Sequence, residues 1–388
     1  MKTKPLTQVC NITTGKLDAN AATLNGRYPF FTCAPTPLRI DTFSFDDDVI
    51  LLAGNNAQGD FHLQRYTGKF NAYQRTYVIT AREGYDIDYI KYSLELSLRH
   101  LKRIAQGSQT KFLTMQILDS FQVIDIPYND QKRLIGSVKE IDRKISMNTK
   151  MSSILESMAK TLYDYWFVQF DFPDENGRPY RAFGGEMVWN PQLKREIPKG
   201  WEVGNLYSIA DFVNGLACQK YRPKDGDPGL PVIKIKEMHD GITADTEKVS
   251  ANIPEKNKVI DGDVLFSWSA TLEVMYWFGG NGGLNQHIFK VNPKSYFSKE
   301  YVFEQLSAYV INFVKMAEAR KTTMGHITTD HLEQSCIVLP PEAIIGKITL
   351  LLHPIHTKIG QLNQENRELI KLRDWLLPML MNGQARVE

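Results

Sequence analysis

Two different periods of hydrophobic residues alternate along this chain. Residues 1–128 carry short β-branched and aromatic runs, such as residues 49–52 and 76–79, separated by Gly, Asn, Asp and Pro, and this pattern predicts a mainly β region. One amphipathic helix, residues 89–104, interrupts it, with apolar residues at helical spacing. Residues 201–340 repeat the pattern, with a second such helix at residues 301–319. We therefore expect two β regions of similar design.

A heptad-like period follows each β region. Apolar residues spaced alternately by three and four positions predict a long helix that pairs with another helix. In the first copy the pairing positions are Ile141, Ile145, Asn148, Ser152, Leu155, Ala159, Leu162 and Trp166. In the second they are Ile355, Ile359, Leu362, Asn366, Leu369, Arg373, Leu376 and Leu380. Each set includes an asparagine, Asn148 or Asn366, which is typical of a helix pair whose register or partner is specified.

The two halves are related by an internal duplication with a period of about 214 residues. Residues 48–51 correspond to residues 263–266, and Asn71 corresponds to Asn285 in matching turns rich in Gly and Asn. The long-helix positions Leu155 and Leu162 correspond to Leu369 and Leu376 at the same offset. A period of this length indicates a duplicated domain rather than a solenoid.

We therefore predict an α+β fold with a pseudo-two-fold duplication, in which the two long helices pair as an antiparallel coiled coil. The predicted segments are a first β domain (1–128), a first spacer helix (129–168), a linker rich in Pro, Gly and aromatic residues (169–200), a second β domain (201–340) and a second spacer helix (341–388). If the helices are antiparallel, the two β domains have inverted orientations.

Composition adds few constraints. The 388 residues carry a net charge of only +2, so any electrostatic attraction to nucleic acid must be local. The four cysteines show no Cys-x-x-Cys spacing, which favours reduced thiols over disulfides or a zinc site. No signal peptide or bilayer-spanning apolar run is evident, so we expect a cytoplasmic protein.

Three stretches of this sequence resemble the DNA-specificity subunits of type I restriction-modification enzymes. They are residues 162–173, with Leu-Tyr-Asp-Tyr-Trp-Phe and Phe-Asp-Phe-Pro, residues 185–190, with Gly-Glu-Met-Val-Trp-Asn, and residues 197–203, with Ile-Pro-Lys-Gly-Trp-Glu-Val. The resemblance covers the whole chain, because the order of β domain, helix, β domain and helix is the plan of that family. The first copy differs in that no Ile-Pro-Lys-Gly-Trp segment precedes it.

The resemblance implies a function without catalysis by this chain. Each β domain would be a target recognition domain that reads one half of a split DNA sequence, and the helices would space the domains and bind two modification subunits. Those subunits would carry S-adenosylmethionine, and restriction subunits would add ATP and Mg. Because the two β domains differ in sequence, we expect an asymmetric bipartite target. A helix of about 38 residues is roughly 57 Å long, comparable to about 17 base pairs.

Candidate DNA-binding residues lie in loops that mix cations, amides and aromatic rings, because Arg and Lys hold phosphate or guanine while Asn and Gln pair with adenine. In the first domain they are Lys69, Asn71, Tyr73, Gln74 and Arg75, followed by Gln109, Thr110 and Lys111. In the second they are Asn285, Gln286 and His287, followed by Arg320, Lys321, Thr322 and Thr323, with Lys220, Tyr221 and Arg222 near the domain start. The alternative reading of these loops is ordinary turn chemistry and surface solvation.

An enzyme would need a catalytic constellation that the sequence lacks. Residues 54–60 have the glycine spacing of a P-loop but end in Asp60 where a lysine must contact phosphate. His353 and His356 are spaced to bracket a metal ion but have no third ligand at a fixed spacing, so we predict no metal site. Two alternatives to the specificity subunit are a coiled-coil structural adaptor and a fused methyltransferase or nuclease of a related system.

Overall fold

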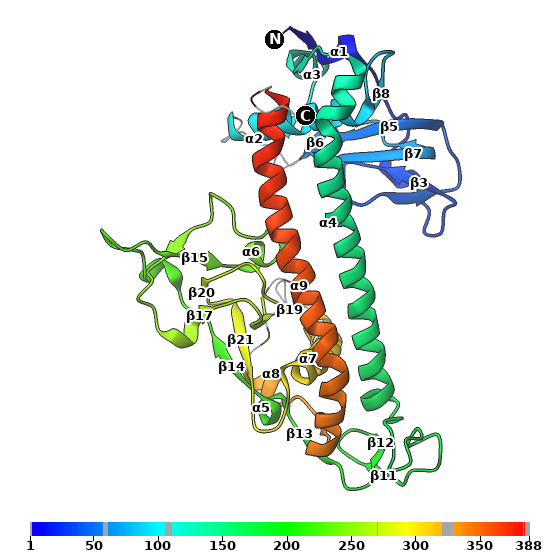
Figure 1. The fold of residues 1–388 in the computed structure, drawn as a ribbon. Helices are drawn as coiled ribbons and strands as arrows, with labels where there is room; N and C mark the ends of the chain where they lie inside the picture. The colour runs from blue at the N-terminus through cyan, green and yellow to red at the C-terminus, as the bar shows by residue number, and fades with distance from the viewer. Residues whose placement is uncertain are drawn as a thin grey trace. The chain divides into compact units, whose positions relative to one another are not determined.

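The computed structural model describes residues 2–56, 61–104, 111–269, 271–319, 327, 329–382 and 384 (Figure 1). The chain forms two compact units, unit 1 (Met1–Lys144 with Leu369–Glu388) and unit 2 (Ile145–Glu368). The division passes through both long helices, α4 (Tyr128–Tyr163) and α9 (Glu342–Met381). Each unit therefore combines a β region with one segment of each long helix, whereas the sequence pattern had set the helices apart as separate segments.

Unit 1 is built on a sheet in which β5 is covered on both faces. The elements are β1 (Thr3–Pro5), α1 (Leu6–Val9), β2 (Cys10–Thr14), η1 (Ala19–Ala21), β3 (Tyr28–Phe31), β4 (Leu38–Ile40), β5 (Phe45–Ala53), β6 (Asn55–Asn56), β7 (Leu63–Ala72), β8 (Thr76–Ala81), α2 (Ile87–Ile104), β9 (Lys111–Phe112), α3 (Met115–Ser120) and β10 (Gln122–Ile124). Strand order in the sheet is β2-β8-β5-β7-β3-β4. Ile50 and Leu52 pack in the cluster that contains α2, while Val49 and Leu51 pack with Phe70 on the other face. This explains why β5 is a continuous apolar run, because neighbouring side chains of a strand point to opposite faces and both faces are buried here.

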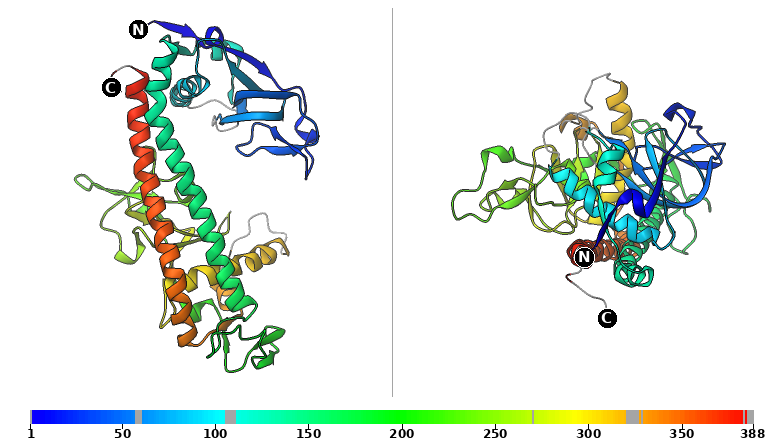
Figure 2. Two further views of the ribbon diagram at one scale, coloured as in Figure 1. Left: turned by 45° about the vertical axis from the view of Figure 1, so that its right-hand side comes forward. Right: turned by 90° about the horizontal axis from the view of Figure 1, so that it is seen from above.

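Helix α2 lies between this sheet and the long-helix segments of unit 1 (Figure 2). Its apolar face buries Tyr89, Ile90 and Leu94, each at most 1% exposed. The same cluster contains Val138 of α4 and Leu377 of α9. The 3.6-residue period of α2 thus serves to join the sheet to the two helix segments.

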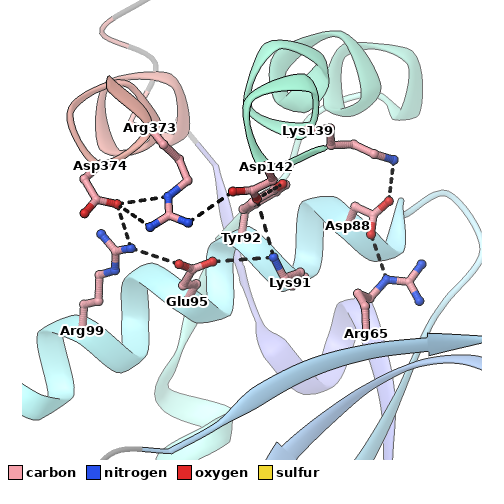
Figure 3. Close-up of polar contacts among 10 residues, drawn as sticks. All are labelled: Arg65, Asp88, Lys91, Tyr92, Glu95, Arg99, Lys139, Asp142, Arg373 and Asp374. Carbon is pink, nitrogen blue, oxygen red and sulfur yellow. Dashed lines mark hydrogen bonds and ion pairs between the residues drawn. The ribbon is translucent and has the colours of Figure 1, made fainter. Parts of the chain in front are cut away.

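A polar network reinforces this contact along the edge of α2 (Figure 3). The Tyr92 hydroxyl donates a hydrogen bond to Asp142 of α4 at 2.6 Å, and Arg373 of α9 donates to the same carboxylate at 3.2 Å. Asp88 of α2 pairs with Arg65 of β7 at 2.8 Å and with Lys139 of α4. Carboxylates on α2 and α4 are therefore paired with cations from β7, α4 and α9.

Asp88 supplies a test of this network. Burial disfavours its charged form, but hydrogen bonds and charges from Lys139 and Arg65 outweigh burial and hold the pKa of this carboxyl below its ordinary value. The resulting stabilisation is complete above the unfolded-state pKa of about 4 and is lost as the pH falls through the lower folded-state pKa. We expect Asp88→Asn to lower the free energy of unfolding by about 1.5–3 kcal/mol at pH 7.

The measurement is urea unfolding of both proteins over a pH series. The difference between wild type and Asp88→Asn should shrink as the pH falls below about 4. Asp47→Asn, at an exposed position on β5, is the matched control and should stay within about 0.5 kcal/mol of wild type. A pH-independent difference would contradict the ionic origin of the effect.

Unit 2 repeats the design of unit 1. Its elements include β13 (Glu202–Gly204), α5 (Leu206–Ile209), β14 (Ala210–Asn214), η3 (Cys218–Lys220), β15 (Leu230–Ile233), α6 (Ile235–Asp240), β16 (Lys248–Val249), η4 (Glu255–Asn257), β17 (Lys258–Val259), β18 (Val264–Ser267), β19 (Glu273–Tyr276), β20 (Gly282–Leu284), β21 (Ile288–Pro293), α7 (Lys299–Ala319), α8 (Thr329–Glu333) and β22 (Ile337–Leu339). The order β14-β21-β18-β19 reproduces β2-β8-β5-β7. The parallel pairing of β15 with β20 likewise reproduces that of β3 with β7.

Strand register supports the duplication but shifts the predicted correspondence of residues 48–51 by one, because the structure equates Ile50 with Val264 rather than with Leu265. Ile50 pairs with Ile79 in unit 1, and Val264 pairs with Val291 at the corresponding place in unit 2. Short two-stranded pairs, β1 with β10 and β13 with β22, join the ends of each domain in the same way. The predicted α+β class with an internal duplication is confirmed.

The long helices are antiparallel within unit 2. Asn148 of α4 donates a hydrogen bond to Glu365 of α9 at 2.8 Å, and Asn366 of α9 donates to Thr149 at 3.3 Å. Further along α4, Ala159 packs in one cluster with Leu352 of α9, so residue numbers rise along one helix as they fall along the other. Both seam asparagines are thus bonded across the helix pair. All predicted pairing positions, from Ile141 to Trp166 and from Ile355 to Leu380, are buried or half-buried.

The segment predicted as a linker, residues 169–200, packs into the core of unit 2. After α4 the chain makes a π-helical turn, η2 (Asp164–Val168), and later a hairpin of β11 (Met187–Asn190) and β12 (Arg195–Pro198). Phe172 stacks on Trp201 with ring centroids 4.9 Å apart, and Phe170 is 0% exposed. Aromatic residues of the segment 169–200 therefore contribute to the buried core of unit 2. Among the helices that the structure describes, we find none with the length and apolarity needed to span a bilayer.

Candidate nucleic-acid interface

In unit 1 the turn between β7 and β8 docks against the segment that follows β2. The Gln74 amide donates a hydrogen bond to the Leu17 carbonyl at 2.9 Å, and the Tyr73 amide donates to Phe31 at 2.9 Å. Leu17 and Tyr73 also form a parallel β-bridge. Two sequence-distant loops are therefore joined through their backbones, which fixes the position of the side chains between them.

Glycine is required where these loops meet. A Cβ atom at Gly15 would lie 2.0 Å from the Ala72 carbonyl oxygen, and one at Gly215 would lie 2.0 Å from the Asn285 carbonyl oxygen. The same close approach therefore occurs in both units. Sequence reasoning did not single out these glycines, because neither lies in a recognisable motif.

The structure corrects both the predicted correspondence and the predicted role of Asn71 and Asn285, because the matching parallel bridges equate Asn285 with Tyr73 rather than with Asn71. Asn71 is 2% exposed, and its side-chain oxygen accepts a hydrogen bond from the Ala72 amide at 3.1 Å. Asn285 is 5% exposed and lies beside the Cys218 thiol. Neither side chain is available for reading a base, because both are buried.

Other predicted residues of the first turn are exposed at its surface. Lys69, Gln74 and Arg75 are exposed, whereas Tyr73 is half-buried. The Lys69 ammonium lies 4.7 Å from the centre of the Phe43 ring, and the Arg75 guanidinium lies 5.9 Å from that of Phe112. Cations over aromatic rings at a surface suit contact with phosphates or bases.

The strand that follows the second predicted loop lies at the same place. Gln109 and Thr110 lie outside the described residues, as does the side chain of Lys111. After them, β9 pairs with β6, and the Leu113 amide donates a hydrogen bond to the Gly54 carbonyl at 2.9 Å. The Tyr77 hydroxyl donates to the Leu113 carbonyl at 2.8 Å. A cavity of about 320 Å³ results, lined by Thr14, Gly54, Gln74, Arg75, Tyr77, Phe112 and Leu113.

Unit 2 forms the corresponding place with different side chains. Leu216 and Asn285 form the matching parallel bridge, and the Ile327 amide donates to the Trp268 carbonyl at 3.0 Å. The Trp268 ring packs on His287 with centroids 5.5 Å apart, and its indole N–H donates to Asn214 at 3.4 Å. The predicted residues Arg320, Lys321, Thr322 and Thr323 lie outside the described residues.

The remaining candidate DNA-binding residues of unit 2 differ in their exposure to solvent. Lys220, Tyr221 and Arg222 are exposed around the end of η3, whereas Gln286 and His287 are half-buried. The Gln286 side-chain nitrogen lies 3.2 Å from Nε2 of His287. Trp268 and Asn214 were missed by sequence reasoning, since only the tertiary arrangement brings them to the predicted loops.

The cysteines and acids show packing roles. Burial raises the pKa of the Cys10 thiol to about 12, so it stays protonated and unreactive at neutral pH. Within the described ranges, no group of three or more His, Cys, Asp or Glu residues is arranged to hold a metal ion. His356 instead pairs with Glu304 of α7 at 3.1 Å, both nearly buried.

Comparison with known proteins places these features in context. A family model for the type I restriction modification DNA specificity domain matches residues 1–157 and 198–371. The type I restriction enzyme MjaIX specificity subunit of Methanocaldococcus jannaschii is 24% identical over 325 residues, which span 80% of this chain and 72% of that protein. The EcoDI specificity subunit of Escherichia coli is 29% identical over 228 residues, 55% of this chain and 50% of that protein.

A solved structure shares the fold. The type I restriction-modification system S subunit from M. genitalium aligns over 98% of this chain and 95% of its own, with a TM-score of 0.56 and 14% sequence identity. At that identity the likeness concerns the fold alone.

Proposed function

Because the chain belongs to the family of type I restriction modification DNA specificity domains, we propose that it is the DNA-recognition subunit of a type I restriction-modification complex and is itself not catalytic. It reads an asymmetric bipartite target in the cytoplasm. The observation that carries this proposal is the duplicated surface at the ends of β2 and β8 and of β14 and β21. Both surfaces have one backbone framework, joined at Gly15 and Gly215.

The side chains on this framework differ between the units. Unit 1 presents Gln74, Arg75 and Phe112, while unit 2 presents Gln286, His287 and Trp268. Base edges are distinguished by donors, acceptors and methyl groups, so different side chains on a common framework select different bases. One chain then reads two unlike half-sites, as a symmetric dimer reads two like ones.

The proposal includes two modification subunits as partners, and exposed apolar stripes on the long helices support it. On α4, Met147, Met151, Ile154 and Met158 follow the four-three-four spacing of one helix face and are 60%, 49%, 48% and 50% exposed. On α9, Leu372 and Trp375 are 45% and 61% exposed, and Leu372 corresponds to Met158 in the duplication. Exposed apolar stripes of this kind are typical of docking surfaces.

In this complex the cofactors belong to the partners. The modification subunits would use S-adenosylmethionine, and restriction subunits would use ATP and Mg. We assign no cofactor to this chain, whose proposed role is binding. The helices α4 and α9 would set the unread spacing between the half-sites.

The proposal is tested by mapping adenine methylation in cells that express this chain with its modification subunit, using cells without the chain as the control. We expect methylation at one split, asymmetric motif that disappears without the chain. A methylome unchanged by the chain, with an active modification subunit, would instead favour a coiled-coil structural adaptor. Methylation by the purified chain alone would favour a fused methyltransferase.

A further inference from the structure

We propose that the cavity between β8 and β9 is a guanine-binding site and that Arg75 reads this base in the half-site recognised by unit 1. This inference rests on the proposed function and adds to it the base type, the half-site and the residue. The cavity measures about 320 Å³ and opens beside the turn that carries Arg75.

Arg75 differs from the structural arginines of unit 1 in having no carboxylate partner among the described residues. Arg65 and Arg373 are 24% and 22% exposed and are held in ion pairs. Arg75 is exposed, and its guanidinium lies 5.9 Å from the ring centre of Phe112, which is itself 53% exposed. An aromatic face orients a guanidinium without occupying its N–H donors.

The backbone beneath Arg75 is fixed. Its carbonyl accepts a hydrogen bond from the Gly54 amide at 2.8 Å, and the neighbouring amides of Gln74 and Thr76 donate to Leu17 at 2.9 Å and to Tyr73 at 2.8 Å. Discrimination between bases requires the reading group to be held in place, since a loose side chain adapts to any base. Arg75 therefore combines a fixed backbone with a guanidinium that has no carboxylate partner among the described residues.

The chemistry of the lining selects guanine. Guanine presents two acceptors, O6 and N7, to which a guanidinium donates two hydrogen bonds, whereas the other bases do not offer that pair. Among the described residues the lining contains no carboxylate, which would be the acceptor for the amino group of cytosine. The nearby Asp18 carboxylate accepts from the Gln74 amide nitrogen at 3.4 Å.

Unit 2 has no Lys or Arg at the corresponding place among its described residues. Trp268, His287 and Asn214 occupy it instead, joined by the ring contact and the indole hydrogen bond. We place the guanine site in unit 1, and changes at Arg75 should leave the other half-site untouched.

The experiment uses the complex of this chain with its modification subunit and fluorescent duplexes carrying its mapped motif. Each guanine of the motif is replaced in turn by 7-deazaguanine, which lacks the N7 acceptor. We expect one replacement, in a single half-site, to weaken wild-type binding roughly tenfold or more. Arg75→Ala should weaken binding to the normal duplex similarly and show no further loss with 7-deazaguanine.

Two further variants separate base reading from general attraction. Arg75→Lys keeps the charge but loses the bidentate donor, so other bases should be accepted at that one position of the methylated motif. Lys69→Ala, at an exposed cation outside the cavity, should affect all duplexes equally. A motif unchanged in Arg75→Ala, at every position, would overturn the guanine site alone. A wild-type complex with no split motif would overturn the proposed function itself.

Discussion

Replacing Leu377 with alanine is expected to lower the free energy of unfolding of unit 1 by about 2–5 kcal/mol. Leu377 of α9 is 0% exposed and packs in one cluster with Tyr89 and Leu94 of α2 and Val138 of α4. Truncation removes buried apolar surface and leaves a cavity at the point where the sheet, α2 and the long helices are joined. The measurement is denaturant unfolding of the full chain, followed by circular dichroism.

The matched control is Leu372→Ala, the same change five residues earlier on the same helix. Leu372 is 45% exposed, so its truncation should change stability by no more than about 0.5 kcal/mol. Equal destabilisation by the two changes would mean that the end of α9 does not contribute to the core of unit 1.

Replacing Met151 and Met158 together with lysine should strongly weaken binding of the modification subunit while the free chain remains folded. Both side chains lie on the exposed stripe of α4, where a docked helix would bury them. Two desolvated lysines at such positions cost the interface at least about 2 kcal/mol, a loss of roughly thirtyfold in affinity. Because both side chains are half exposed in the free chain, folding should be little affected.

Binding is measured by titrating the variant chain into labelled modification subunit, and methylation of the mapped motif is followed in cells. The control is Ser153→Lys, an exposed position of the same helix that lies off the stripe. Wild-type affinity in the double variant would show that this face does not carry the partner, and the location of the docking surface would then be wrong.

The helix-pairing positions could be predicted from the sequence because they follow a regular spacing. Steps of three and four residues from Ile141 to Trp166 follow one face of a helix, and the structure leaves each of these positions buried or half-buried. Asn148 was predicted in the seam from its position alone. Its partner Glu365, and the hydrogen bond between them, required the helix pair.

Which residues of the candidate site are exposed, in contrast, could not be predicted from the sequence. Asn71 and Asn285 satisfied every compositional criterion for base readers, yet both side chains are buried. Arg75 and Phe112 are far apart in sequence and become neighbours because β9 pairs with β6 beside the turn that follows β7. Loop composition reports residue type but carries no information about which face of a turn is covered.

The sequence by itself determined the duplication, the succession of β regions and long helices, and the family, because each is written in local periodicity or in contiguous motifs. Tertiary structure alone decided that each compact unit takes a segment of both long helices, and that residues 169–200 belong to the core of unit 2. It also decided which loop side chains remain exposed. These properties depend on contacts between segments distant in the chain, and burial is settled only when those segments meet.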